Sequence, residues 1–132
     1  MPATVVIALG SNLGNRHWYI RAAIEELARV IHLVRVGRIR ETEPVGAPPP
    51  RYLNCVIAGY TTLTPEALLR ELQRIETRLG RRRPYRNAPR TIDLDLILHS
   101  ANRRRTRELT LPHPRYRERA FVLEPMRELG FG

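Results

Sequence analysis

Two kinds of hydrophobic repeat alternate along this chain, and their order constrains its fold more than any other feature. Apolar side chains that are consecutive or fall at every second position indicate strands, whereas a spacing of three or four indicates a helix. Strands are predicted over residues 4–9, 33–40, 53–61 and 91–98. Helices are predicted from about residue 15 and over residues 65–79. The predicted order is therefore β-α-β-β-α-β.

Both predicted helices carry local signals that support them. The apolar stripe of the first helix consists of Ile20, Ile24, Leu27 and Ile31. In the second helix, Thr64 suits the N-cap and Pro65 the first helical position, and Gly80 suits the stop just beyond the last turn. The stripe of this helix consists of Leu68, Leu72, Ile75 and Leu79.

This order of elements predicts an α+β fold, a ferredoxin-like sandwich in which one antiparallel sheet carries both helices on one face. The opposite face would be available for a ligand, covered by two long proline-containing loops at residues 43–51 and 81–90. Residues 103–111 are expected to form a minor hairpin and residues 120–129 a short last helix. Because 132 residues is the usual size of one domain, residues 1–132 are expected to form a single domain.

The charge of the chain indicates an anionic partner. The 23 basic and 13 acidic residues give a formal net charge of +10, which suits either a phosphorylated small molecule or a nucleic acid. A bias toward arginine codons is the alternative explanation of the excess. All 23 basic residues are arginine, so the lysine-dependent phosphate-binding loop is excluded.

Composition also excludes several other classes of protein. The single cysteine, Cys55, excludes an internal disulfide and a cysteine-based zinc cluster. No apolar run approaches the roughly 20 residues that cross a bilayer, and the apolar segment at residues 5–7 is too short for a secretory signal. A cytoplasmic domain with no membrane partner is therefore expected.

Asp93 and Asp95 are the only aspartates of the chain, and they lie two positions apart in the strand predicted over residues 91–98. Alternation puts both on one face, about 7 Å apart. The apolar residues expected on the other face are Ile92, Leu94, Leu96 and Leu98. Like charges this close repel each other, and a Mg²⁺ ion shared with substrate phosphates would resolve the conflict. The alternative is that both carboxylates face water or pair with arginines.

The residues just before this strand favour the metal site, because an arginine-rich loop beside two carboxylates suits a polyphosphate. The arginines are Arg81, Arg82, Arg83, Arg86 and Arg90. Glu76 lies within the apolar stripe of the second helix, where it either anchors an arginine or loop backbone near the site or reaches solvent. Asn54 and Tyr52 share one face of the third strand. Asn54 would match the amide edge of a heterocycle and Tyr52 would stack on it with Phe121; ordinary packing is the alternative.

Five segments together resemble the 6-hydroxymethyl-7,8-dihydropterin pyrophosphokinase family of folate synthesis. They are ALGSNLGNR (8–16), ETEPVG (41–46), RYLNCV (51–56), RNAPRTIDLDLIL (86–98) and LPHPRYRERAFVLEP (111–125). The resemblance extends from the first strand to about Leu129 and implies the same ferredoxin-like fold. It also implies transfer of pyrophosphate from ATP to the hydroxymethyl group of a reduced pterin, with release of AMP.

The resemblance further implies a role for each matching residue. Asp93 and Asp95 would hold two Mg²⁺ ions, while Arg83 and Arg90 would neutralise phosphate oxygens. The remaining nucleotide contacts would come from Gln73, Leu96, Thr110, His113 and Arg119, and the pterin contacts from Thr42, Val45, Tyr52, Asn54 and Phe121. The expected partners are small-molecule substrates bound by a monomer, without nucleic acid.

Four positions depart from the family pattern. Asn87 and Ala88 replace a common Trp-Gly pair, Glu108 replaces a nucleotide-binding arginine of some relatives, and Pro114 replaces a tyrosine. These departures affect the expected ATP contacts. The alternative function is a ferredoxin-like RNA-binding module, but such modules display aromatic side chains on their central strands. This chain lacks the RNP1 pattern of those modules, and its fourth predicted strand presents aspartates that would repel phosphate.

Overall fold

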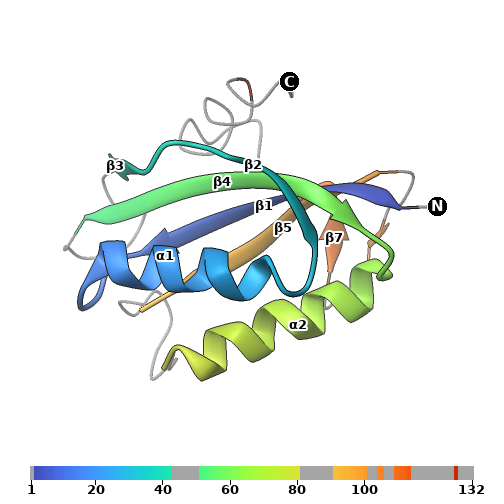
Figure 1. Ribbon diagram of the computed structural model, residues 1–132. Helices are drawn as coiled ribbons and strands as arrows, with labels where there is room; N and C mark the ends of the chain where they lie inside the picture. Colours follow the sequence, from blue (N-terminus) through green and yellow to red (C-terminus); the bar gives the residue numbers. More distant parts are fainter. Residues whose placement is uncertain are drawn as a thin grey trace.

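The computed structural model describes residues 2–42, 51–80, 91–100, 104–105, 109–113 and 127. In these residues, Figure 1 shows a curved sheet with two helices packed beneath it. The sheet contains β1 (Ala3–Ser11), β2 (His32–Val36), β3 (Arg40–Thr42), β4 (Tyr52–Thr61) and β5 (Asp93–His99). The helices are α1 (Arg16–Leu27) and α2 (Pro65–Arg78). A separate pair of strands consists of β6 (Arg104–Arg105) and β7 (Thr110–Leu111).

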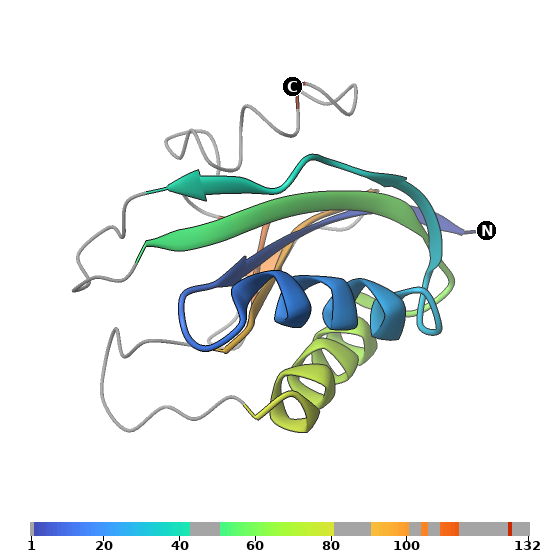
Figure 2. The same cartoon turned by 60° about the vertical axis from the view of Figure 1, so that its left-hand side comes forward.

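The strand order places β1 inside the sheet, with β4 on one side and β5 on the other. Among the described residues the order is β2-β4-β1-β5, β3 also pairs with β4, and every pair is antiparallel. Figure 2 shows α1 and α2 on the same face of the sheet. Strand β1 is paired along both edges and has an apolar cluster on each face, and its residues from Val5 to Ser11 are all buried. These observations confirm the predicted α+β, ferredoxin-like arrangement.

Apolar side chains form two clusters, one on each face of the sheet. The larger cluster packs between sheet and helices and includes Val5, Ile7 and Leu9 of β1 with Ile20 of α1 and Leu72 of α2. The smaller cluster lies on the face opposite the helices and contains Val6, Ala8, Val56, Ala58 and Ile97. This second cluster covers only part of that face. The polar side chains of the face lie beyond the cluster, where β1 ends and β4 and β5 begin.

A β-bulge in β5 changes which face its last residues occupy. Leu96 pairs with Ile7 and Leu98 with Val6, so Ile97 is an extra residue in this strand. Leu94 and Leu96 accordingly pack in the helix-side core, as predicted, whereas Leu98 packs against the cluster on the other face. The prediction for Leu98 is wrong because strict alternation cannot anticipate an inserted residue.

The strand predicted over residues 33–40 is interrupted, so the prediction of one continuous strand is wrong. Both β2 and β3 pair with β4, and residues 37–39 between them leave the ladder. Gly37 donates its N–H to the Val56 carbonyl over 2.9 Å. A Cβ atom at Gly37 would lie only 2.8 Å from that carbonyl oxygen, so glycine allows the close approach here.

The helix predictions are confirmed at three of the four helix ends. Asn15 caps α1 by accepting the Trp18 N–H, and Thr64 caps α2 by accepting the Ala67 N–H. Helix α2 ends before Gly80, whose φ of +82° suits glycine. Helix α1, however, ends at Leu27 after 12 residues. Ile31, which was predicted in its stripe, reaches the core from the turn beyond the helix.

The remaining predictions for the C-terminal third concern the hairpin and the last helix. The hairpin is confirmed, because Arg104 pairs with Leu111 and Arg105 with Thr110. The helix predicted over residues 120–129 lies outside the described residues apart from Arg127. Neither described helix is both long and apolar enough to cross a membrane.

Candidate active site

Neighbouring strands bring polar side chains into one row on the face opposite the helices. Gly10 of β1 lies opposite Asn54 of β4 and opposite Asp93 of β5, and Arg40 of β3 lies opposite Asn54 on the other side of β4. Directly opposed residues in antiparallel strands share a face. With strands about 4.8 Å apart, the backbones of Asn54 and Asp93 are separated by roughly 10 Å. In Figure 1 this row lies at the left end of the sheet, near the start of α1.

Asp93 and Asp95 occupy the polar face as predicted. Both are partly exposed, whereas Leu94 between them is buried in the helix-side core. The β1 residues opposite them, Gly10 and Ala8, carry at most a methyl group. The two carboxylates therefore lie beside a part of β1 that carries only small side chains.

Gly10 also provides the space that Tyr52 and Asn54 occupy. A Cβ atom at Gly10 would lie 3.3 Å from Cδ1 of Tyr52 and 3.4 Å from Oδ1 of Asn54. Tyr52 is partly exposed and Asn54 is buried. The ring and the carboxamide thus lie side by side over β1, with the ring edge open and the amide withdrawn from solvent.

The outer edge of β5 is covered by two other elements. Glu76 of α2 accepts the Leu94 N–H over 2.8 Å, and the His113 N–H just after β7 is donated to the Ile97 carbonyl over 2.9 Å. Of the two alternatives for Glu76, the structure therefore shows the anchor: its side chain is buried and binds the backbone of the aspartate strand. His113 therefore lies beside Ile97 of β5, which is two residues beyond Asp95 in the chain.

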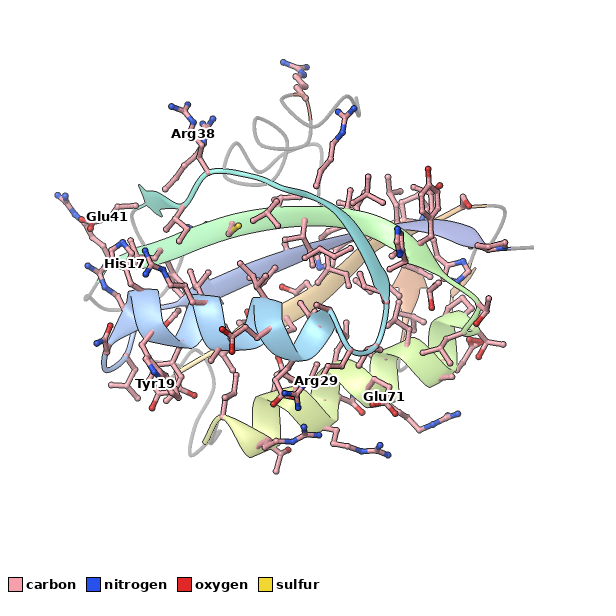
Figure 3. All side chains as sticks on the ribbon, viewed as in Figure 1. His17, Tyr19, Arg29, Arg38, Glu41 and Glu71 are labelled. Carbon is pink, nitrogen blue, oxygen red and sulfur yellow. The ribbon has the colours of Figure 1, made fainter. Side chains whose placement is uncertain are left out.

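A network of ion pairs and hydrogen bonds joins the start of α1 to the residues on either side of residues 43–50. Arg16 at the start of α1 pairs with Glu41 of β3 over 3.2 Å and donates to the Arg51 carbonyl over 2.7 Å. Arg51 also pairs with Glu41 over 3.5 Å. Figure 3 shows Glu41 at the same end of the sheet as the start of α1. The network therefore holds together the residues on both sides of residues 43–50.

The other predicted site residues are placed less completely. Gln73 is exposed on α2, and the Leu96 side chain is in the helix-side core. Thr42 pairs with Tyr52 and Thr110 with Arg105 through their backbones, but the side chains of both threonines lie outside the description. Five predicted residues lie wholly outside the described residues: Val45, Arg83, Arg90, Arg119 and Phe121. The departures at Asn87, Ala88, Glu108 and Pro114 also lie there.

Two contributions to the site were missed from the sequence. Neither Gly10 nor Arg40 was predicted to have a site role in the sheet. The alternation of β3 places Arg40 on a definite face, but only its pairing with Asn54 shows that it is the polar face. Gly10 could have been suspected because glycine is unusual inside an otherwise apolar strand and often marks a close approach.

The donor chemistry of the site suits a magnesium ion held jointly with a substrate. Among the described residues no group of three or more His, Cys, Asp or Glu side chains could hold a metal. Magnesium is commonly bound by one or two carboxylates together with waters and substrate phosphates. Asp93 and Asp95 supply that number of carboxylates from one rigid strand.

Cys55 lies next to Asn54 in sequence but takes no part in the polar face. Its side chain is in the helix-side core, and its thiol donates to the Gly37 carbonyl over 3.3 Å. Burial raises the pKa of the Cys55 thiol to about 11. The thiol is therefore protonated at neutral pH and unsuited to act as a nucleophile.

A pocket of about 480 Å³ lies at the other end of the sheet, near the N-terminus. It is lined by Pro2, Val30, His32, Tyr60, Thr61 and Thr62. None of the predicted site residues lines this pocket. The chemistry-bearing side chains therefore lie at the opposite end of β1 and β4.

Comparison with known proteins identifies the family of this chain. Residues 6–130 match the family model of 7,8-dihydro-6-hydroxymethylpterin-pyrophosphokinase. The chain belongs to this family. The 2-amino-4-hydroxy-6-hydroxymethyldihydropteridine pyrophosphokinase of Bacillus subtilis is 43% identical over 126 residues, covering 93% of this chain and 75% of the relative. Another, from Aquifex aeolicus, is 34% identical over 128 residues, covering 96% and 80%.

Some relatives of this pyrophosphokinase are much longer proteins. The mitochondrial folate synthesis bifunctional protein of Arabidopsis thaliana is 42% identical over 127 residues, which cover 95% of this chain and 23% of that protein. The comparisons thus identify the chain as a pyrophosphokinase enzyme of folate synthesis. They give no support to the alternative of an RNA-binding module.

Proposed function

We propose that the pyrophosphokinase holds magnesium on Asp93 and Asp95, the pterin on Asn54 and Tyr52 to one side of them, and ATP at the outer edge of β5 on the other side. The observation that carries this proposal is the shared row in which Asn54 and Asp93 flank Gly10 on one face. The carboxylate pair and the ring-binding pair are then separated by no more than the length of one substrate molecule. The family reaction needs both of them at one place.

The pterin subsite is proposed from the surroundings of Gly10. Asn54 is buried and offers one acceptor and two donors, which complement the amide edge of the pterin. The Tyr52 ring lies beside it and is open enough to stack on a flat heterocycle. Thr42 pairs with Tyr52 across β3 and β4, so its main chain lies within reach of the same ring. Val45 and Phe121 are proposed to complete the subsite on the family pattern.

The nucleotide subsite is proposed at the outer edge of β5. Leu94 directs its N–H toward Glu76 and therefore away from β1, and backbone groups two residues apart in a strand face the same way. The main chain of Leu96 is thus available at this edge although its side chain is buried. His113 after β7 lies at that edge through its bond to the Ile97 carbonyl, with Thr110 close by in sequence. Gln73 lies three residues before Glu76 on α2 and is proposed to contact the nucleotide from the helix. Arg83, Arg90 and Arg119 are proposed to bind the phosphates.

The proposed reaction joins the two subsites. The hydroxymethyl oxygen of the pterin attacks the β-phosphorus of ATP, a new O–P bond forms, the bond to the α-phosphate oxygen breaks and AMP leaves. Asp93 and Asp95 would hold two Mg²⁺ ions, which would supply positive charge against the triphosphate and a lower pKa for the attacking hydroxyl. Asn54 and Tyr52 orient the pterin so that its hydroxymethyl group faces β5. Asp93 and Asp95 hold their positions because Leu94 between them is packed in the core.

The direct test measures AMP formation from ATP with and without 6-hydroxymethyl-7,8-dihydropterin and Mg²⁺. AMP is expected only when all three components are present. Hydrolysis of ATP at the same rate without the pterin would contradict the proposal. A monomeric, cytoplasmic enzyme without a nucleic-acid ligand is proposed as well. Sedimentation of the purified chain tests the first point, and RNA that binds as tightly as ATP regardless of Mg²⁺ would contradict the last.

A further inference from the structure

Glu76 is placed where neither burial nor the helix favours a carboxylate. It is only 7% exposed, although ionised side chains lose favourable hydration when they are buried. It also lies in the last turn of α2, where the helix dipole disfavours negative charge. The stability of α2 alone therefore does not explain a glutamate at this position.

The contact that Glu76 makes lies at the centre of the proposed metal site. Its Oε2 atom accepts the N–H of Leu94 over 2.8 Å, and Leu94 is the residue between Asp93 and Asp95. This N–H cannot pair with β1, because it points to the opposite edge of β5. A buried N–H without an acceptor is costly, so Glu76 determines where this part of β5 lies relative to α2.

We propose that Glu76 is a positioning residue for the two metal-binding carboxylates. By holding the Leu94 peptide, it sets the distance of β5 from α2 and the rotation of this strand about its own axis. Asp93 and Asp95 project from the strand on the face opposite the helices. Small displacements of this strand would change the separation and direction of the two carboxylates, and a metal site depends on its ligands being held within about 0.5 Å. The inference rests on the proposed magnesium site, and it concerns a residue that does not itself touch the metal.

Two substitutions separate the hydrogen bond from the charge. Glu76→Gln keeps the length of the side chain and an oxygen that accepts the Leu94 N–H, but removes the charge. Glu76→Asp keeps the charge, but its carboxylate is one methylene too short to reach Leu94. The matched controls are Glu71→Gln and Glu71→Asp on the same helix, where Glu71 pairs with Arg74 over 3.0 Å. If positioning is the role of Glu76, Glu76→Gln behaves as the wild type and Glu76→Asp does not.

Two measurements read the effect. The first is the hydrogen-exchange rate of the Leu94 amide in the full chain without substrate, and we expect Glu76→Asp to accelerate it by roughly tenfold or more, as loss of one hydrogen bond to a charged group implies. The second is the Mg²⁺ concentration at half-maximal activity, which should rise by a similar factor in Glu76→Asp. Both values should stay within about threefold of the wild type in Glu76→Gln and in both Glu71 variants.

The opposite pattern would overturn the inference. If Glu76→Asp leaves the Mg²⁺ midpoint unchanged, or if Glu76→Gln raises it as much as Glu76→Asp does, the hydrogen bond to Leu94 does not position the site. A general loss of stability is distinguished with Ile20→Val, a core substitution in α1 that should lower the melting temperature without moving the Mg²⁺ midpoint. A change of the midpoint in Ile20→Val would likewise count against the inference.

The proposed metal site itself is tested separately with Asp95→Asn. If Asp95→Asn binds Mn²⁺ in the presence of an ATP analogue as tightly as the wild type does, the metal site fails, whatever the Glu76 variants show. If Asp95→Asn weakens Mn²⁺ binding and Glu76→Asp does not, only the positioning role fails. Both the Mn²⁺ measurement and the Leu94 exchange rate are independent of turnover.

Discussion

Gly10 lies directly beside the ring of Tyr52, so that a single added Cβ atom would stand 3.3 Å from Cδ1 of that ring. The glycine is part of a central strand, where it weakens the sheet relative to a residue with a side chain. A glycine at this position leaves space on the polar face of β1 that a side chain would fill. In this pyrophosphokinase the space is taken by Tyr52 and Asn54, the two residues proposed to bind the pterin.

Gly10→Ala should therefore impair pterin binding more than ATP binding. The added methyl group forces Tyr52 or Asn54 to shift, and overpacking of this kind costs about 1–3 kcal/mol. We expect KM for the pterin to rise roughly tenfold, with KM for ATP changed less than about threefold. Steady-state kinetics with each substrate varied in turn measure both constants. Ala67→Gly, at the remote start of α2, serves as the control for a loss of stability, and equal changes in both KM values would contradict the assignment.

Asp95→Ala should remove turnover while leaving the fold intact. The side chain projects from the polar face and is partly exposed, whereas the adjacent Leu94 is in the core. Loss of an electrostatic group that acts on the reacting phosphates lowers kcat by about 10²- to 10³-fold in other enzymes, and we expect at least that. Thermal unfolding followed by circular dichroism should change by only a few degrees. A large fall in melting temperature would show that the carboxylate has a structural role.

Arg16→Ala should loosen the contacts between α1 and the residues on either side of residues 43–50. It removes the ion pair with Glu41 and the hydrogen bond to the Arg51 carbonyl. Because exposed ion pairs contribute about 0.2–1 kcal/mol, the free energy of unfolding should fall by no more than about 1 kcal/mol. We expect KM for the pterin to rise severalfold, since Thr42 follows Glu41 and Tyr52 follows Arg51 directly in the chain. Arg74→Ala, which breaks the comparable pair with Glu71 on α2, should leave this KM unchanged.

Cys55 should make the stability of the enzyme fall at alkaline pH. Burial raises the pKa of its thiol from 9.0 to about 11 in the folded protein, so the folded state retains a proton that the unfolded state loses. The contribution is fully present below pH 9 and is lost as the pH rises toward 11, by about 2 kcal/mol at most. Urea unfolding at pH 8, 9, 10 and 11 measures it.

Cys55→Ala provides the control for this pH dependence. The variant retains all five tyrosines, which also titrate in this range, and the chain has no lysine to add a further contribution. Its unfolding free energy should be lower at pH 8, because a buried side chain has been truncated, but it should fall less steeply between pH 9 and 11. Identical slopes in the two proteins would contradict the assigned role of the thiol.

Local patterns in the chain were sufficient for much of the architecture. The cap at Thr64 and the stop at Gly80 were readable because each depends on neighbouring residues only. The faces of Asp93, Asp95, Tyr52 and Asn54 followed from alternation, which is also a local property of a strand. Alternation failed at Leu98, where the extra residue at Ile97 is set by the pairing of β5 with β1.

What the amino-acid order determined by itself is therefore the succession of strands and helices and the face on which Asp93, Asp95, Tyr52 and Asn54 lie. Only the tertiary structure decided that Asn54 and Asp93 flank Gly10, that Arg40 joins their row, and that Glu76 binds the peptide between the two aspartates. The physical reason is distance along the chain. Strand register and helix-to-strand contacts join residues dozens of positions apart, and they depend on how the whole core packs rather than on any local repeat.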